Sequence, residues 1–330
     1  MATVSVLDAH SVTPHGIETI DPQALGQDGL IADGWDRLAI EAEVCLRAAQ
    51  KLDIETALVP PDFPLFLADY FRAAGIELKV DEDEFIQRRR VKSGPELEGI
   101  RRAQKAADAA MGVARDLIHE LRAGLTSEQV RAAMAKVCEE HGCELSDDAI
   151  VSHGEQSARG HDSGSGLIGA GEPVVVDIWP RDKASRCYAD MTRTFVAGGG
   201  EPPEELAEYH RLTQESLRRV YADLRAGANG RALFERSAEP YIEAGQPTQL
   251  TKEPGTVLED GYFHGLGHGV GLEVHERPFM GRMGDDLLAG EVVTVEPGCY
   301  RRGFGGCRLE DLVLVTEDGY EIITEFPYDL

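Results

Sequence analysis

The spacing of apolar residues changes near residue 93. Before this point, helical spacing at residues 35–51 and 66–74 alternates with the apolar runs IETALVP (54–60) and IELKV (76–80). Alternation of short apolar runs with helical stretches is typical of a small α/β unit. We therefore expect residues 1–90 to form a small N-terminal α/β domain and residues 91–330 to form the main domain.

Paired helices are predicted in the main domain. Ser93 and Glu96 fit a capping box, and apolar residues then recur at helical spacing from Ile100 onward. Thr126 and Gln129 repeat the capping pattern ahead of a second apolar series. Helical spacing returns at residues 204–224 and 231–244. The sequence thus predicts a helix pair on each side of about residue 200.

Strands are predicted between and after these helix pairs. The runs PVVVDIW (173–179) and CYADMTRTFV (187–196) are rich in β-branched residues and enclose the turn-like segment PRDKAS, which favours a β-hairpin. Apolar runs at residues 291–295 and 312–315 indicate further strands. Each half of the main domain therefore combines a helix pair with strands.

Acidic residues interrupt or adjoin these apolar runs, where a carboxylate without a partner is costly to bury. They are Asp177, Asp190, Glu296 and Glu310. For one acid alone, a buried ion pair with Arg193, Arg302 or Arg308 is the simpler explanation. Because four such acids share one part of the chain, a metal site is the better common cause.

The segment HGLGHGVGLEVHERP (264–278) carries His264, His268 and His275. Its alternating glycines exclude a stable helix, so the two histidines four residues apart are not a helical HExxH zinc motif. The segment also lacks the GxGxxG spacing of a dinucleotide-binding loop. The glycines let the backbone turn closely around a bound group. The three imidazoles can then supply one metal ligand together with neutral hydrogen-bond donors or bases.

Composition narrows the partners and the compartment. A formal net charge of −26 repels nucleic-acid phosphates and anionic lipid, and the basic run at residues 88–90 is too short to reverse it. Solubility of an acidic surface explains that charge without a charge-specific partner. We expect a cytoplasmic protein, because we find neither a membrane-spanning apolar run nor a secretory signal. The six cysteines form no CxxC pair, and we interpret them as reduced thiols, with Cys299 and Cys307 as small buried residues rather than zinc ligands.

The chain resembles the pita-bread metallopeptidases, which include methionine aminopeptidase, Xaa-Pro aminopeptidase and Xaa-Pro dipeptidase. The resemblance rests on five motifs in the same order along the chain: VVVDIW, YADMTRTF, HGLGHGVGLEVHE, TVEPG and RLEDLVLVTEDG. The resemblance covers about residues 90–325. The Xaa-Pro branch is favoured by the sequences of three motifs, DMTRTF, HGLGH and RLEDLVLVTEDG, and by the N-terminal α/β segment. This resemblance implies an α+β fold in which pseudo-twofold helix pairs pack on a curved antiparallel sheet.

The resemblance also implies a role for individual residues. The implied metal ligands are Asp177, Asp190, His268, Glu296 and Glu310, with Asp190 and Glu310 bridging. The implied catalytic residues are His161, His264, His275, Glu296 and Arg308. His161 is preferred to His153 as the substrate-facing histidine, because its separation from Asp177 along the chain is about that of the family's substrate-facing histidine. His153, beside a glycine, is more simply a loop or strand residue with a satisfied hydrogen bond.

The implied activity is hydrolysis of the peptide bond before proline by a hydroxide that bridges two divalent metal ions. Mainly oxygen ligands suit manganese, our first expectation, or cobalt, zinc or iron. A bond to proline has a tertiary amide nitrogen, so a site can select it by shape and by requiring no N–H donor. The expected partners are a small peptide substrate and a second copy in a homodimer, without nucleic acid or membrane.

Two alternatives stay open. A relative of the same fold hydrolyses or lyses a small non-peptide substrate, as creatinase-like, ectoine-hydrolase-like and sulfoniopropionate-lyase-like members do. The long loop after Asp177, the Trp179-Pro180 pair and the short N-terminal segment keep this alternative in play. A metal-free binding module is the weaker alternative, because every implied metal ligand is present.

Overall fold

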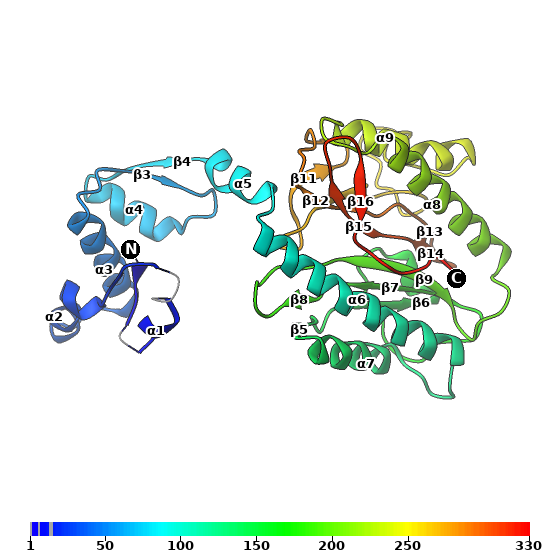
Figure 1. Ribbon diagram of the computed structural model, residues 1–330, viewed down its shortest axis with the longest axis horizontal. Helices are drawn as coiled ribbons and strands as arrows, with labels where there is room; N and C mark the ends of the chain where they lie inside the picture. The colour runs from blue at the N-terminus through cyan, green and yellow to red at the C-terminus, as the bar shows by residue number, and fades with distance from the viewer. Residues whose placement is uncertain (1, 6, 13–15) are drawn as a thin grey trace. The chain divides into compact units, whose positions relative to one another are not determined.

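The computed structural model describes residues 2–5, 7–12 and 16–330, and the chain divides into two compact units (Figure 1). The first unit ends at Ile86, and the second spans Gln87–Leu330. Each unit has hydrophobic clusters of its own. The elements up to the division are β1 (Ala2–Thr3), α1 (Ala9–Val12), β2 (Thr19–Ile20), the 3₁₀ helix η2 (Pro22–Leu25), α2 (Gln27–Ala32), α3 (Arg37–Lys51), β3 (Thr56–Val59), α4 (Leu65–Ala73), β4 (Glu77–Val80) and α5 (Glu82–Arg90), which spans the division.

The first unit forms the expected alternation of helices and strands. Strands β3 and β4 are parallel and are connected through α4, as parallel neighbours require a crossover. Helix α3 buries Leu46 and Ala49 in one small cluster with Ile76, and it buries Ile40 and Val44 in another. The predicted helices at residues 35–51 and 66–74 and the strands at 54–60 and 76–80 all form, with ends shifted by a few residues.

Capped helices frame the second unit. Its helices are α6 (Gly94–Glu120), α7 (Ser127–Glu140), α8 (Glu204–Asp223) and α9 (Gly230–Glu243), with the 3₁₀ helix η3 (Gly154–Ala158). The Ser93 backbone N–H donates to the Glu96 carboxylate at 2.8 Å, and Thr126 and Gln129 exchange hydrogen bonds at the start of α7. Both capping patterns therefore begin helices where the sequence places them.

The strands of the second unit pair antiparallel. They are β5 (Cys143–Glu144), β6 (Ile150–His153), β7 (Pro173–Ile178), β8 (Arg181–Asp182), β9 (Met191–Val196), β10 (Gly267–Gly269), β11 (Glu276–Met280), β12 (Val292–Val295), β13 (Gly298–Arg301), β14 (Gly305–Arg308), β15 (Asp311–Val315) and β16 (Tyr320–Ile322). One sheet has the order β6-β7-β9 and another the order β11-β10-β12-β15-β16. The predicted hairpin is the β7–β9 pair, whose connecting loop adds the short strand β8. A bridge between Thr192 and Glu310 joins the two sheets.

The two helix pairs cover the strands from different sides. Helices α6 and α7 contact β9 and β6, whereas α8 contacts β13 and β14 and α9 contacts β11. Figure 1 shows the pair α6 and α7 along one side of the strands and the pair α8 and α9 along another. Each helix pair thus packs on a core cluster of its own, and the sheets meet between the two pairs. In the described part of the chain, no helix combines the length and apolar character needed to cross a bilayer.

Candidate metal centre and adjoining cavities

The sheet junction brings the predicted ligands to one place. Asp177 lies on β7, Asp190 directly precedes β9, and the β7–β9 register pairs Asp177 with Thr192. Thr192 in turn bridges to Glu310, which directly precedes β15. His268 on β10 and Glu296 at the end of β12 complete the group, because β12 lies between β10 and β15. All five predicted ligands line one cavity of about 380 Å³.

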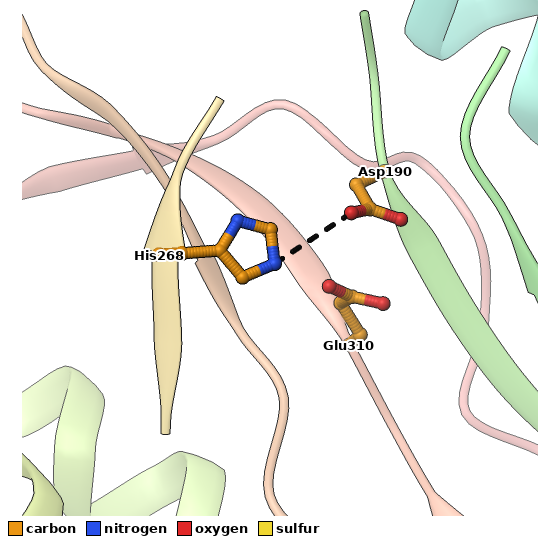
Figure 2. A group of neighbouring side chains, drawn as sticks. All are labelled: Asp190, His268 and Glu310. Atoms are coloured by element: carbon orange, nitrogen blue, oxygen red, sulfur yellow. Dashed lines mark ion pairs between the residues drawn. The ribbon is translucent and has the colours of Figure 1, made fainter. Parts of the chain in front are cut away.

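The donor atoms of Asp190, His268 and Glu310 lie within 4.8 Å of one another. Figure 2 shows their side chains pointing toward a common point from three different segments of the chain. The His268 Nε2 atom is 3.8 Å from Asp190 Oδ2 and 3.5 Å from Glu296 Oε1. These separations are too long for direct hydrogen bonds, but they leave room for a cation between the donors.

Little in the surrounding protein balances the charge of these acids. Asp190 Oδ1 is buried without a hydrogen-bond partner among the described residues. Glu310 accepts a hydrogen bond of 2.6 Å from the Thr192 hydroxyl, and Asp177 accepts one of 2.6 Å from Arg308. The other arginines that could form ion pairs here are engaged elsewhere, Arg193 with Asp311 and Arg302 with Glu259. Ion pairing therefore accounts for one acid of the group.

The pKa shifts at the centre have the same cause. Burial, followed by the charges of neighbouring carboxylates, raises the pKa of Asp190 and of Glu310 well above the ordinary range. Burial also raises the pKa of Glu296 to about 8 and lowers the pKa of His268 to about 3. The ionised forms of these buried acids are unfavourable without nearby positive charge, and the neutral imidazole of His268 supplies none. Bound cations would supply that charge. The donor set fits divalent metal ions.

The backbone around His268 fixes which ring nitrogen faces the acids. His268 Nδ1 donates to the Gly269 carbonyl at 3.2 Å, so Nε2 keeps its lone pair toward Asp190 and Glu296. Glycine is required on both sides because the backbones pack closely. A Cβ at Gly267 would lie 2.1 Å from the Thr294 carbonyl oxygen, and one at Gly269 would lie 2.3 Å from that of Arg277.

A hydrogen-bonded chain runs from Asp177 to His264. Arg308 donates to Asp177 at 2.6 Å and to the Tyr300 hydroxyl at 2.8 Å. His264 Nδ1 donates to the Gly265 carbonyl at 2.8 Å, which leaves Nε2 to accept from Tyr300 at 2.9 Å. Burial lowers the pKa of His264 to about 3, so its ring is neutral, as this arrangement requires. Arg308 thus orients an acid of the centre, and Tyr300 is a member that sequence reasoning missed.

The predicted histidines separate into two groups. His161 and His275 line the central cavity, and the ring centroids of His275 and His268 are 4.2 Å apart. His153 instead pairs with Glu172 at 2.7 Å and contacts the Ser165 carbonyl at 3.2 Å. It is not among the residues that line the central cavity. The satisfied hydrogen bonds expected of His153 are therefore present.

A second cavity of about 390 Å³ adjoins the first, because both are lined by His161, His268, His275 and Glu296. Its other lining residues include Phe263, His264, Phe279 and Arg308. The central cavity is also lined by Asp148 and Trp179, which were not predicted as site residues. Asp148 lies outside the predicted strands, so only the tertiary fold reveals its position.

Comparison with known proteins identifies the family. Residues 98–317 match the model of metallopeptidase family M24. The chain belongs to this family. The Xaa-Pro dipeptidase of Pyrococcus furiosus is 32% identical over 257 residues, which cover 77% of this chain and 68% of that protein. The predicted membership of the pita-bread metallopeptidases, in their Xaa-Pro branch, is confirmed.

Solved structures of this M24 family show the same fold. A prolidase from Pyrococcus furiosus has a TM-score of 0.72 and 29% identity, covering 83% of this chain and 77% of that chain. An X-Pro aminopeptidase from Thermotoga maritima MSB8 has a TM-score of 0.75 and 29% identity, covering 90% of this chain and 80% of that chain. These likenesses confirm the α+β pita-bread fold. The roles of the individual site residues stay predictions.

Proposed function

We propose that this chain is a metal-dependent peptidase that cleaves the peptide bond before proline. The observation that carries the proposal is the convergence of His268 with buried acids, among which Asp190 has an oxygen that no described residue hydrogen-bonds. The proposed metal ligands are Asp177, Asp190, His268, Glu296 and Glu310. The similarity to an Xaa-Pro dipeptidase and to an X-Pro aminopeptidase supports the substrate class.

Charge balance favours two divalent ions. The proposed ligands include four carboxylates, and Arg308 is the buried cation that contacts one of them. When all four carboxylates are ionised, their four negative charges match the four positive charges of two divalent ions, and a set of mainly carboxylate ligands favours manganese. When bound, such ions polarise a carbonyl group and make water a stronger nucleophile near neutral pH.

The chain's own residues have separate tasks in this proposal. His161 and His275 face the cavity and donate to the carbonyl oxygen and to the leaving nitrogen as charge develops there. Glu296 lines both cavities and is placed to pass a proton from water to that nitrogen. Arg308 holds Asp177 in position through its 2.6 Å contact.

The adjoining cavities favour a peptide over a small non-peptide substrate. A cavity of about 380 Å³ is within the range that holds a small ligand, and the second cavity of about 390 Å³ extends the space beyond it. A compact substrate such as creatine would leave the second cavity unused. The homodimer and the cytoplasmic location remain predictions.

Hydrolysis by purified protein tests the proposal. The protein is stripped of metal, supplied with manganese, cobalt or zinc, and offered Ala-Pro, Ala-Pro-Ala, Met-Ala-Ser and creatine. We expect metal-dependent cleavage before proline, with manganese the most effective ion. Cleavage of creatine alone would replace the peptidase by a non-peptide hydrolase, and failure to bind divalent metal would remove the proposed centre.

A further inference from the structure

A third cavity, of about 830 Å³, lies outside the proposed metal centre. Its wall combines the apolar side chains of Phe234, Leu250 and Met283 with the cations Arg231 and Arg282. We call it the arginine pocket. None of the predicted catalytic or metal-binding residues lines it except His264.

The arginine pocket adjoins the cavities at the metal centre. It shares Phe263, His264 and Gly265 with the second cavity, which shares His161 and His268 with the central one. A ligand too long for the central cavity can therefore extend past His264 into the arginine pocket. Such a ligand would have to be extended, as a peptide chain is.

Charge has opposite signs at the two ends of this space. Asp148 lines the central cavity in addition to the acids of the centre, whereas Arg231 and Arg282 line the arginine pocket. A peptide in aqueous solution carries an ammonium at one end and a carboxylate at the other. Electrostatic complementarity therefore favours the N-terminal residue near the metal centre and the carboxylate end in the arginine pocket.

Both arginines are available to a ligand. Among the described residues, no carboxylate lies within ion-pair distance of Arg282, whose side chain is exposed. Arg231 pairs with Glu235 at 2.9 Å, but their side chains are 62% and 48% exposed, and such surface pairs contribute little. In a protein with a net charge of −26, two cations beside one cavity are a local reversal of charge.

Exposed apolar side chains accompany the cations. Leu250 is 36% exposed, Phe279 beside the second cavity 43%, and Met283 89%. Apolar surface that gathers at a cavity is typical of a binding site. These side chains suit the aliphatic parts of a peptide that leads to a carboxylate.

We propose that the arginine pocket binds the carboxylate-bearing end of a peptide that continues beyond the proline of the cleaved bond. This inference rests on the proposed Xaa-Pro peptidase function and extends it to the choice of substrate length. A dipeptide ends at proline and leaves the pocket empty. Peptides of three or more residues use the pocket, so the enzyme acts as an aminopeptidase on short peptides rather than as a strict dipeptidase.

Kinetics with manganese-loaded full-length protein test the inference. The substrates are Ala-Pro, Ala-Pro-Ala, Ala-Pro-Ala-Ala, the C-terminal amide of the last, and Ala-Pro-Ala-Glu amide. We expect kcat/KM to rise with length and to fall about tenfold in the tetrapeptide amide, which loses a charge-assisted contact. Recovery with the glutamate-containing amide would identify an acidic side chain as a second source of the carboxylate, and its failure would restrict recognition to the C-terminus.

Variants connect the preference to the arginines. Arg231→Gln with Arg282→Gln should make the tetrapeptide and its amide equally good substrates and leave kcat/KM for Ala-Pro unchanged. Arg236→Gln is the matched control, because Arg236 is on the same helix as Arg231 and lines a different cavity. Equal rates for the tetrapeptide acid and amide in the unaltered protein would overturn the inference.

A binding measurement separates failure of the inference from failure of the proposed function. Calorimetry with the product-like peptide Pro-Ala-Ala and its amide requires no turnover. We expect the acid to bind about tenfold more tightly, and the doubly substituted protein to lose this difference. If Xaa-Pro bonds are not cleaved but the binding difference is present, the proposed function is wrong and carboxylate binding by the arginine pocket is supported. If Ala-Pro is cleaved and the binding difference is absent, the pocket fails and the function stands.

Discussion

At the scale of single residues, Glu310 shows how the fold buries an acid that we propose as a metal ligand. The residue is 2% exposed, and its carboxylate accepts a hydrogen bond from Thr192 and faces Asp190 and His268. Burial raises the pKa of Glu310, so the protein alone does not stabilise its charged form. If Glu310 is a metal ligand, as we propose, bound cations supply the free energy that holds its carboxylate ionised.

Replacing Glu310 tests that dependence. Glu310→Gln keeps the size of the side chain and removes the negative charge of a proposed metal ligand. We expect metal affinity and kcat/KM to fall by at least about 100-fold, since even the partners of metal ligands contribute 10- to 100-fold. Elemental analysis of dialysed protein and steady-state kinetics measure the two effects. Glu321→Gln, at a surface pair with Arg101, is the control, and full metal occupancy in Glu310→Gln would remove the residue from the ligand set.

His275 is predicted to act on the substrate rather than on the metals. It lines both cavities at the centre and lies beside His268, but it is not in the ligand cluster. His275→Ala should retain the bound metal and lower kcat about 100-fold, the usual loss when a donor to the oxyanion is removed. His153→Ala, outside the central cavity, should leave kcat within about twofold. Similar losses in both variants would contradict the assignment of His275.

Residue types that conflict with their surroundings were predictable from the sequence. An acid in a β-rich run, such as Asp177, is expensive unless it has a partner, and glycines around His268 indicate a close backbone approach. The sequence does not single out Tyr300 or Arg282 as site residues, because a tyrosine in a strand and an arginine in a loop are common. Their importance depends on neighbours that only the tertiary structure supplies.

At the scale of elements, Arg193 holds the two sheets together where the centre lies. It is on β9, is fully buried, and its guanidinium contacts Asp311 of β15 at 2.8 Å and the Glu310 carbonyl at 2.7 Å. It also donates to the carbonyls of the C-terminal segment, at Phe326 and Pro327. A buried cation with this many acceptors cannot be removed without leaving them unsatisfied.

Arg193→Met should therefore lower the free energy of unfolding by about 3–5 kcal/mol, because Asp311 is left as an uncompensated buried charge. Urea unfolding of the metal-loaded protein measures the loss. Arg218→Met, at a side chain 68% exposed, should change stability by less than about 0.5 kcal/mol. Adding Asp311→Leu to Arg193→Met should recover part of the loss. A cost of Arg193→Met no larger than that of Arg218→Met would mean that the junction does not depend on the pair.

Elements with strong local patterns were predictable, and elements that depend on their partners were not. Helices α6 and α7 begin at capping boxes and show long apolar series, so their starts could be placed closely. Strands β10, β13 and β14 span three or four residues rich in glycine, which gives no clear alternation. They form because neighbouring strands pair with them, and the sequence pattern does not carry that information.

At the scale of the whole molecule, the residues after Ile86 belong to the second unit. Arg90 contacts the carboxylate of Glu291, a fully buried residue, and donates to the Asp286 carbonyl at 2.7 Å. Arg89 contacts Glu276, the residue after His275, at 2.6 Å. Arg89 and Arg90 of the basic run thus form ion pairs inside the second unit. A boundary after residue 90, as the sequence pattern predicts, would separate these arginines from their partners.

Two truncated chains distinguish the boundaries. The chain 87–330 keeps Arg90 and every proposed site residue, so it should fold and bind metal as the full protein does. The chain 91–330 leaves Glu291 buried without its cation, and burial already raises the pKa of this acid. It should be less stable by about 3–5 kcal/mol in urea unfolding, and Arg90→Met in the chain 87–330 should reproduce most of that loss. Equal stability of the two chains would instead place the boundary after residue 90, because it would mean that the arginine run contributes nothing to the metallopeptidase unit.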